Sequence, residues 1–135
     1  MTRYVIDADV ALRLTQGGPS DLPPGHRLLA PTLLRSQLLS RLYQAVRAGA
    51  MERRQAETQL DRVRALRIRL LGDRVLQRLA WQLAEQLGWD DTLTAEYVAL
   101  TRLQADAFVT QDAALRRALK GVVPVVTLKD LLAPG

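Results

Sequence analysis

The sequence contains no cysteine and only one histidine, His26. Without cysteine there is no disulfide and no thiolate metal site. The single histidine lies in a stretch rich in proline and glycine, which argues against a zinc centre and against a Ser-His-Asp triad. We expect His26 to be an exposed loop residue, and we expect any metal chemistry to rely on oxygen ligands.

Long apolar segments are also lacking. No run approaches the ~18 consecutive apolar residues typical of a transmembrane helix, and the first residues do not resemble a signal peptide. Aromatic residues make up only 4% of the chain, so the core must consist mainly of leucine, valine and alanine. The length of 135 residues predicts a single domain over residues 1–135, with no membrane association and a cytoplasmic location.

Lysine is nearly absent. Among the 19 basic residues only Lys120 and Lys129 are lysines, and the net charge is +5. Guanidinium groups bind phosphate and carboxylate well, so a polyanionic partner, either RNA or an acidic peptide, is one interpretation. The other interpretation is that arginine use reflects genome composition and that most of these side chains lie on solvated helix faces.

Short strand-like runs alternate with helical patterns along the chain. Strands are predicted at residues 3–6, 27–30, 67–71, 107–109 and 122–126. Helical patterns cover residues 10–14, 52–66, 75–87, 112–119 and 128–132; another opens at 31–32 and stops at Gly49, and one begins at 90–91. This alternation predicts an α/β fold in which helices cover both faces of a parallel sheet.

Two predicted strands are followed closely by an aspartate. Asp7 comes directly after residues 3–6, and Asp112 comes shortly after residues 107–109. Ligands of parallel sheets bind outside the carboxyl ends of the strands. Carboxylates gathered there repel one another unless a cation lies between them, and Mg²⁺ and Mn²⁺ prefer such oxygen ligands. These two residues are therefore the main candidates for a metal site.

Helix capping is the competing role for these acids. Asp9 is expected to cap the first helix in preference to Asp7, and Asp112 is also in position to cap the helix that follows it. Asp73 is expected to be a helix cap, and Asp91 is expected to be the N-cap of the helix that begins at 90–91.

The larger aromatic residues have mainly structural interpretations. Trp81 and Trp89 are expected to pack in the core or at helix ends, and Tyr43 is expected to be a packing residue on its helix. Tyr97 fits either the core or a position near the site.

Four motifs, in order, resemble those of PIN-domain proteins. They are residues 4–12 (YVIDADVAL), 30–40 (APTLLRSQLLS), 94–100 (TAEYVAL) and 105–112 (ADAFVTQD). Their order and spacing, and the length of the chain, resemble the VapC toxin ribonucleases over nearly the whole sequence. The resemblance implies a three-layer α/β/α PIN-like domain with a central parallel sheet.

The resemblance also implies a cluster of acids that binds Mg²⁺ or Mn²⁺ for hydrolysis of a phosphodiester in RNA. The first family acid corresponds to Asp7 and the last to Asp112, whereas the second falls on Gln37 and the third on Thr94. Two of the four carboxylates are thus replaced. Asp91, one helical turn before Thr94, is a candidate substitute ligand, and Asp9 is another. The amide oxygen of Gln37 remains a neutral candidate ligand.

Three functions remain open at this point. The first is a VapC-type endoribonuclease with activity weakened by its incomplete acidic site. The second is a degenerate PIN-like domain that binds RNA or an antitoxin without cleavage. For both, the resemblance implies a VapB-like antitoxin as partner and a homodimer. The third, a haloacid-dehalogenase phosphotransferase suggested by Asp7 and Asp9, fits poorly because Ala11 stands where that family has threonine or valine.

Overall fold

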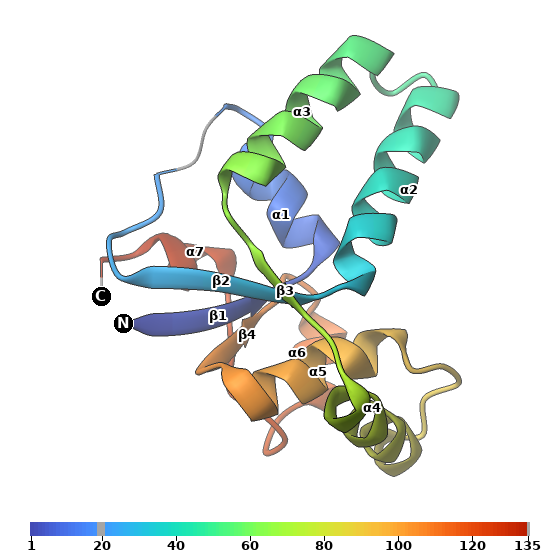
Figure 1. Cartoon of the computed structure of the whole chain (residues 1–135), viewed down its shortest axis with the longest axis vertical. Coiled ribbons are helices and arrows are strands. Elements are labelled where there is room, and N and C mark those ends of the chain that lie inside the picture. Colours follow the sequence, from blue (N-terminus) through green and yellow to red (C-terminus); the bar gives the residue numbers. More distant parts are fainter. Residues whose placement is uncertain (19–20, 135) are drawn as a thin grey trace.

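A single parallel sheet forms the centre of the molecule. In residues 1–18 and 21–134, which the computed structural model describes, five strands lie in the order β3-β2-β1-β4-β5 (Figure 1). They are β1 (Thr2–Ile6), β2 (His26–Pro31), β3 (Arg69–Leu71), β4 (Ala107–Val109) and β5 (Val125–Val126). All neighbouring strands pair in parallel, so the predicted sheet is confirmed. Pro19 and Ser20 of the predicted loop lie outside the described residues.

Seven helices occur in the described part of the chain. They are α1 (Ala8–Thr15), α2 (Leu33–Arg47), α3 (Arg53–Ala65), α4 (Arg74–Leu87), α5 (Leu93–Gln104), α6 (Ala113–Ala118) and α7 (Leu128–Leu132). The first three lie on one face of the sheet, and α4 and α5 lie on the other (Figure 1). This is the three-layer α/β/α fold that the sequence predicted.

The direction of the chain across the sheet reverses between β1 and β4. The chain runs outward from β1 to β2 and β3, then returns to the other side of β1 to form β4 and β5. Ile6 lies beside Val109 in the β1–β4 pair. The carboxyl ends of β1 and β4 therefore meet at the topological switch point, where ligands bind in open α/β sheets.

The core is built around these central strands. Val5, Ile6 and Val109 have no exposed surface, and Val98 of α5 is equally buried beneath them. Strands buried on both faces read as continuous apolar runs, as residues 4–6 and 107–109 do. The site at the strand ends thus rests on fully buried residues of the core.

The ends of several elements follow local signals. Asp73 caps α4 as predicted, since its Oδ1 accepts a hydrogen bond from the backbone N–H of Leu76 at 2.9 Å. Gly88 ends α4 in the left-handed conformation, with a φ of 70°. The third strand begins two residues later than predicted, because Arg67 has a φ of 55° and belongs to the turn after α3.

Three side-chain environments differ from the sequence-based expectation. His26 is buried rather than exposed: its Nδ1 lies 2.9 Å from the carbonyl oxygen of Leu131 in α7, and its ring packs edge-on against Tyr4. Trp81 and Tyr43, expected to pack, are 65% and 64% exposed. Trp89 is partly buried against the core, as predicted.

No helix within the described residues is both long and apolar enough to cross a membrane. The cytoplasmic location stays a prediction.

Candidate active site

A polar pocket of about 400 Å³ opens at the switch point. Its walls come from the carboxyl ends of β1 and β4 and from α1, α2 and α5. All four residues at the positions of the family acids line it, namely Asp7, Gln37, Thr94 and Asp112. The structure therefore brings together residues that are up to 105 positions apart in the sequence.

Asp7 combines a structural role with a chemical one. Its Oδ1 accepts a hydrogen bond from the backbone N–H of Val10 at 2.9 Å, which makes Asp7 the N-cap of α1. The residue is half-buried, and this burial raises the pKa of its carboxyl above the ordinary value, with a contribution from Asp9. The Val10 bond, the Arg41 guanidinium and the Thr110 hydroxyl act in the opposite direction.

The prediction that Asp9 caps α1 is wrong. The helix begins at Ala8, two residues earlier than expected, so the extended residue before it is Asp7. Asp9 lies in the first turn instead, where its carboxylate pairs with Arg13 at 2.9 Å and lies 3.9 Å from Arg41. Asp9 also lines the pocket, but it faces these arginines.

Asp112 is the more open of the two strand-end acids. It is exposed and caps α6, since its Oδ1 accepts from the backbone N–H of Leu115 at 3.1 Å. Its own N–H donates to Thr110 Oγ1 at 3.2 Å. The capping prediction for Asp112 is confirmed, and this role is compatible with a second carboxylate oxygen open to a ligand.

Gln37 is held by a tyrosine. The Tyr97 hydroxyl of α5 donates to Gln37 Oε1 of α2 at 2.5 Å. Tyr97 is buried and stacks on Phe108, with ring centroids 6.0 Å apart. Burial raises the pKa of the Tyr97 hydroxyl, and the carboxylates of Asp7 and Glu96 raise it further, so the hydroxyl keeps its proton. Tyr97, for which the sequence allowed two environments, belongs to both the core and the site.

Asp91 does not reach the pocket. It is exposed in the turn before α5, where its Oδ1 accepts from the backbone N–H of Leu93 at 3.1 Å. The N-cap of α5 is Thr92, so the capping prediction for Asp91 is wrong by one residue. Since its carboxylate serves the turn, the structure gives no support to Asp91 as a metal ligand.

Two arginines of the pocket were missed by the sequence-based reasoning. Arg41 follows Gln37 by four residues on α2, and Arg13 follows Asp9 by four on α1. This spacing places each arginine on the same helix face as a candidate site residue, and it was the signal available in the sequence. The pocket thus contains cations as well as acids.

The donor chemistry of the pocket limits which ion it can hold. Among residues 1–18 and 21–134, no group of three or more histidine, cysteine, aspartate or glutamate side chains is placed to hold a metal ion. Asp9 lines the pocket too but is paired with arginine, so the carboxylates outside ion pairs are those of Asp7 and Asp112, and Thr94 and Thr110 add hydroxyl oxygens. Mg²⁺ accepts one or two carboxylates when waters and substrate phosphates complete its shell, so this set fits one hard divalent ion.

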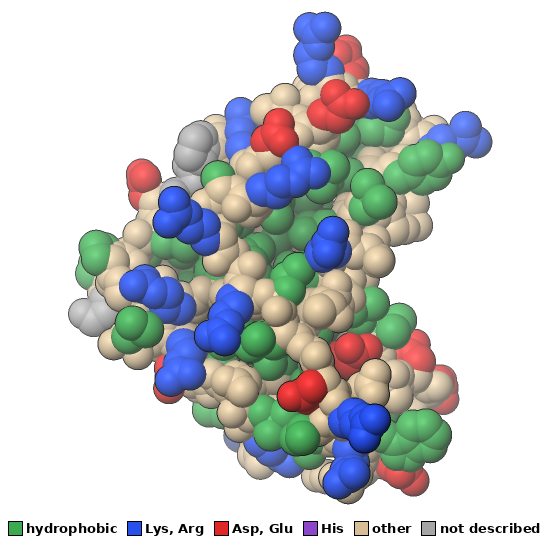
Figure 2. All heavy atoms as spheres, viewed as in Figure 1, with side chains coloured by type: hydrophobic (Ala, Val, Ile, Leu, Met, Phe, Trp, Pro, Cys, Tyr) green, Lys and Arg blue, Asp and Glu red, His purple; other side chains and the backbone are tan. Residues whose placement is uncertain are grey.

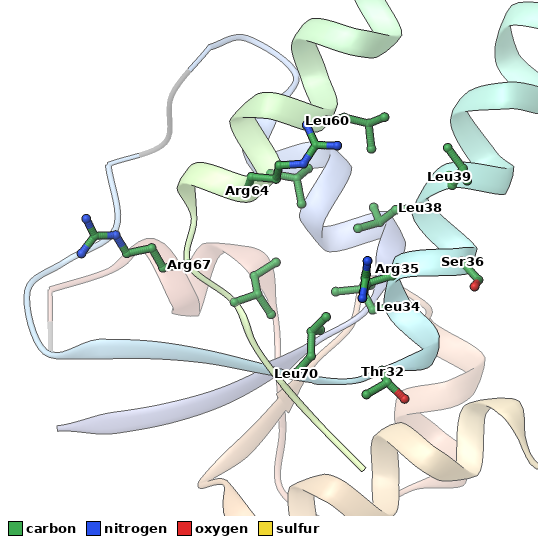
Figure 3. Close-up of a pocket in the computed structure, with 12 residues that line it drawn as sticks. Thr32, Leu34, Arg35, Ser36, Leu38, Leu39, Leu60, Arg64, Arg67 and Leu70 are labelled. Carbon is green, nitrogen blue, oxygen red and sulfur yellow. The ribbon is translucent and has the colours of Figure 1, made fainter.

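A second, larger hollow of about 630 Å³ lies between α2, α3 and β3 (Figure 3). Its floor is apolar and includes Leu34, Leu38, Leu60 and Leu70. We call it the α2–α3 groove. Figure 2 shows hydrophobic side chains gathered in this hollow, with basic side chains around it. The basic residues that line it are Arg35, Arg64 and Arg67.

Comparison with known proteins supports the fold. No family model matches the chain, and no curated protein matches it. Among solved structures, PAE2754 from Pyrobaculum aerophilum superposes with a TM-score of 0.71 at 19% identity, over 97% of this chain and 93% of that one. VapBC2 from Rickettsia felis, solved bound to a DNA fragment from its promoter, gives a TM-score of 0.62 at 11% identity, over 93% and 98%. The chain therefore shares the fold of these two proteins, and this PIN-like fold is the one that the resemblance of its motifs predicted.

Proposed function

We propose that this chain is a metal-dependent endoribonuclease of the VapC toxin type, with activity weakened by a two-carboxylate site. The observation that supports this most is the meeting of Asp7, Asp112, Gln37 and Thr94 in one pocket at the switch point of the sheet. A polar pocket at that edge, supported by a buried core, is where ligands bind in such folds.

In this proposal Asp7 and Asp112 hold one Mg²⁺ or Mn²⁺ ion. When bound, the ion supplies an acidified water and offsets negative charge on the phosphoryl oxygens. The chain itself holds and orients the RNA: Thr94 and Arg41 line the same pocket as the carboxylates and supply hydrogen-bond donors for phosphate oxygens. The arginines on the surface attract the RNA backbone.

Two features account for weak activity. Gln37 and Thr94 bring no negative charge, so two carboxylates must hold a doubly charged ion without help. In addition, Arg41 lies close enough to Asp7 to affect its pKa, and this positive charge opposes a cation in the same pocket. Both features lower metal affinity relative to a site with four acids.

The same features favour a second candidate, a PIN-like domain that binds RNA or an antitoxin without cleaving. The specific observation is that Arg13 and Arg41 already neutralise Asp9 within the pocket. If these cations also bind phosphate, the pocket retains RNA affinity in the absence of a metal. Metal-dependent cleavage distinguishes the two functions.

A VapB-like antitoxin is the proposed partner, supported by the likeness to the VapBC2 structure. The α2–α3 groove fits an amphipathic segment of such a partner, with apolar side chains on the leucine floor and acidic side chains at the rim. Arg64 is paired with Asp61, but Arg35 and Arg67 form no ion pair with any described residue, so they are available to a partner. A homodimer is also proposed, from the resemblance of the motifs to VapC proteins.

Metal binding tests the proposed function directly. At a Mn²⁺ concentration ten times its Kd, the wild-type protein should gain about 1.4 kcal/mol of stability, a rise in Tm of roughly 5 °C. Asp7→Asn and Asp112→Asn should each remove most of this gain, because each takes away one of two charged ligands while an asparagine still caps the helix. Asp73→Asn is the matched control: Asp73 caps α4 with the same geometry but lies outside the pocket.

Cleavage of RNA completes the test. The wild-type protein should cut RNA only with Mg²⁺ or Mn²⁺, and the Asp7→Asn/Asp112→Asn protein should be inactive. Cleavage that persists in the double variant points to a contaminant or to a different site. Absence of both a Mn²⁺ shift and cleavage in the wild-type protein, at millimolar metal, would exclude the nuclease and favour the binding domain.

A further inference from the structure

Gln37 lines the pocket, and its amide forms a hydrogen bond at one end only. Its oxygen accepts the hydrogen bond from the Tyr97 hydroxyl, so the Nε2 group is the part of the side chain left for other partners. Among the described residues, no second hydrogen bond of the Gln37 side chain is formed. An amide N–H₂ is a donor and cannot bind a cation.

We propose that Tyr97 positions Gln37 as a donor to a phosphate oxygen, so that the α2–α5 side of the pocket is a phosphate position and not a ligand position for the metal. This inference rests on the proposed function and deepens it, since it names the group of the substrate that this side of the pocket recognises. Gln37 thus favours an anion at a position where the family acid would favour a cation.

The orientation of the amide follows from its neighbours. A protonated tyrosine hydroxyl needs an acceptor, and the amide oxygen of Gln37 is the acceptor to which it donates. With the amide reversed, Gln37 Nε2 would donate to the Tyr97 oxygen, and the buried hydroxyl proton would lose the acceptor that it has here. This hydrogen bond therefore selects the orientation in which Nε2 points away from Tyr97.

Further donors lie on the same side of the pocket. Arg41 is one helical turn from Gln37 on α2, and Thr94 contributes a hydroxyl from the first turn of α5. Arg41 is half-exposed and its contact with Asp9, at 3.9 Å, is long, whereas Asp9 already has a 2.9 Å partner in Arg13. Arg41 is therefore free to turn toward a bound phosphate.

The pocket consequently has two chemically distinct sides. The strand ends supply the acids Asp7 and Asp112, and the helices α2 and α5 supply the donors Gln37, Arg41 and Thr94. A phosphodiester fits between them with one oxygen toward a cation and another toward the donors. A free phosphate group meets the same donors without any metal.

Nuclear magnetic resonance on the full chain tests this assignment without any measurement of cleavage. The ¹⁵N-labelled protein is titrated with inorganic phosphate and with adenosine 5′-monophosphate, and separately with Mg²⁺ alone. The side-chain N–H₂ signals of Gln37 should shift with either phosphate compound and stay in place with Mg²⁺.

Two variants remove the donor in different ways. Tyr97→Phe keeps the ring against Phe108 but releases the amide, so phosphate affinity should fall about five- to ten-fold, the equivalent of one hydrogen bond, with Mg²⁺ affinity equal or higher. Gln37→Leu should lower phosphate affinity by at least as much and leave Mg²⁺ affinity unchanged. Tyr43→Phe and Gln44→Leu, at exposed positions of α2, are the matched controls.

Opposite results would overturn the inference. If Mg²⁺ alone shifts the Gln37 signals, or if Gln37→Leu lowers Mg²⁺ affinity, the amide oxygen is a metal ligand. If neither phosphate compound shifts these signals in the wild-type protein, the phosphate position does not exist. Neither result bears on RNA cleavage, so the proposed function can fail while this inference holds, and the reverse.

Discussion

The polar pocket and the α2–α3 groove differ in chemistry but share helix α2. Gln37 and Arg41, four residues apart, face the pocket, whereas Leu34 and Leu38, also four residues apart, face the groove and the core. A helix repeats its faces every three to four residues, so one element can serve two surfaces. The pocket gathers charges that oppose one another, and the groove gathers apolar side chains.

The groove and the pocket also differ in how their residues affect the stability of the fold. In the groove, Leu38 contributes to the core and to a surface at the same time, so its burial supports folding. In the pocket, Asp7 is held in a half-buried position that disfavours its charge. A half-buried carboxyl of this kind costs stability, and such costs are expected where a residue serves a ligand rather than the fold.

The largest effect on stability is expected from Leu38→Ala. Leu38 is 4% exposed, and its truncation removes apolar contacts and leaves a cavity, so the free energy of unfolding should fall by about 2–4 kcal/mol. Urea unfolding measures this loss. Leu39→Ala is the matched control: the adjacent leucine is 60% exposed and should change stability by no more than about 0.5 kcal/mol. Equal losses in the two variants would mean that α2 does not separate core from surface as described.

A smaller effect, of opposite sign, is expected from Asp7→Asn. Because burial raises the pKa of Asp7 in the folded state, the unfolded chain ionises first as pH rises from the ordinary value of 3.8, and the native state loses stability until its own pKa is passed. Asparagine does not ionise and still accepts from Val10, so the variant should be more stable than the wild-type protein at pH 7.

The pH dependence of this gain is the decisive measurement. The difference between Asp7→Asn and wild-type protein, taken from urea unfolding, should shrink toward zero as pH falls below 3.8, where the carboxyl is protonated in both states. Asp73→Asn controls for the loss of a charge at a helix N-cap. A variant that is less stable than wild type at pH 7 would show that the charge of Asp7 supports the fold.

These contrasts also show what the sequence could predict. The alternation of strands and helices was enough to bring Asp7 and Asp112 to one sheet edge, and the motifs added Gln37 and Thr94. β4 and α7 have the predicted bounds because their signals are local: an apolar run for β4, and Thr127 capping α7 with a bond from the backbone N–H of Asp130.

Other features depend on contacts that no local pattern contains. The burial of His26 requires the carbonyl group of Leu131, 105 residues away. The hydrogen bond between Tyr97 and Gln37 spans 60 residues and decides which end of the amide faces the pocket. The exposure of Trp81, by contrast, was readable: it lies four residues from Gln77 and from Glu85, on the polar face of α4.

The smallest effect on stability is expected from Asp9→Asn, and it separates the charges of the pocket from the packing of the groove. The pair with Arg13 is partly exposed, and such pairs contribute little, so the free energy of unfolding should fall by no more than about 1 kcal/mol, including the loss of a favourable charge in the first turn of α1.

The change in binding on Asp9→Asn should be clearer than the change in stability. Without Asp9, Arg13 and Arg41 lose their carboxylate partner, so phosphate affinity measured by the same titration should rise. Arg53 and Glu57 form a pair with the same four-residue spacing on α3, more exposed and outside the pocket, and Glu57→Gln should leave phosphate affinity unchanged. A fall in phosphate affinity in Asp9→Asn would mean that Asp9 holds Arg41 in its binding position instead of competing for it.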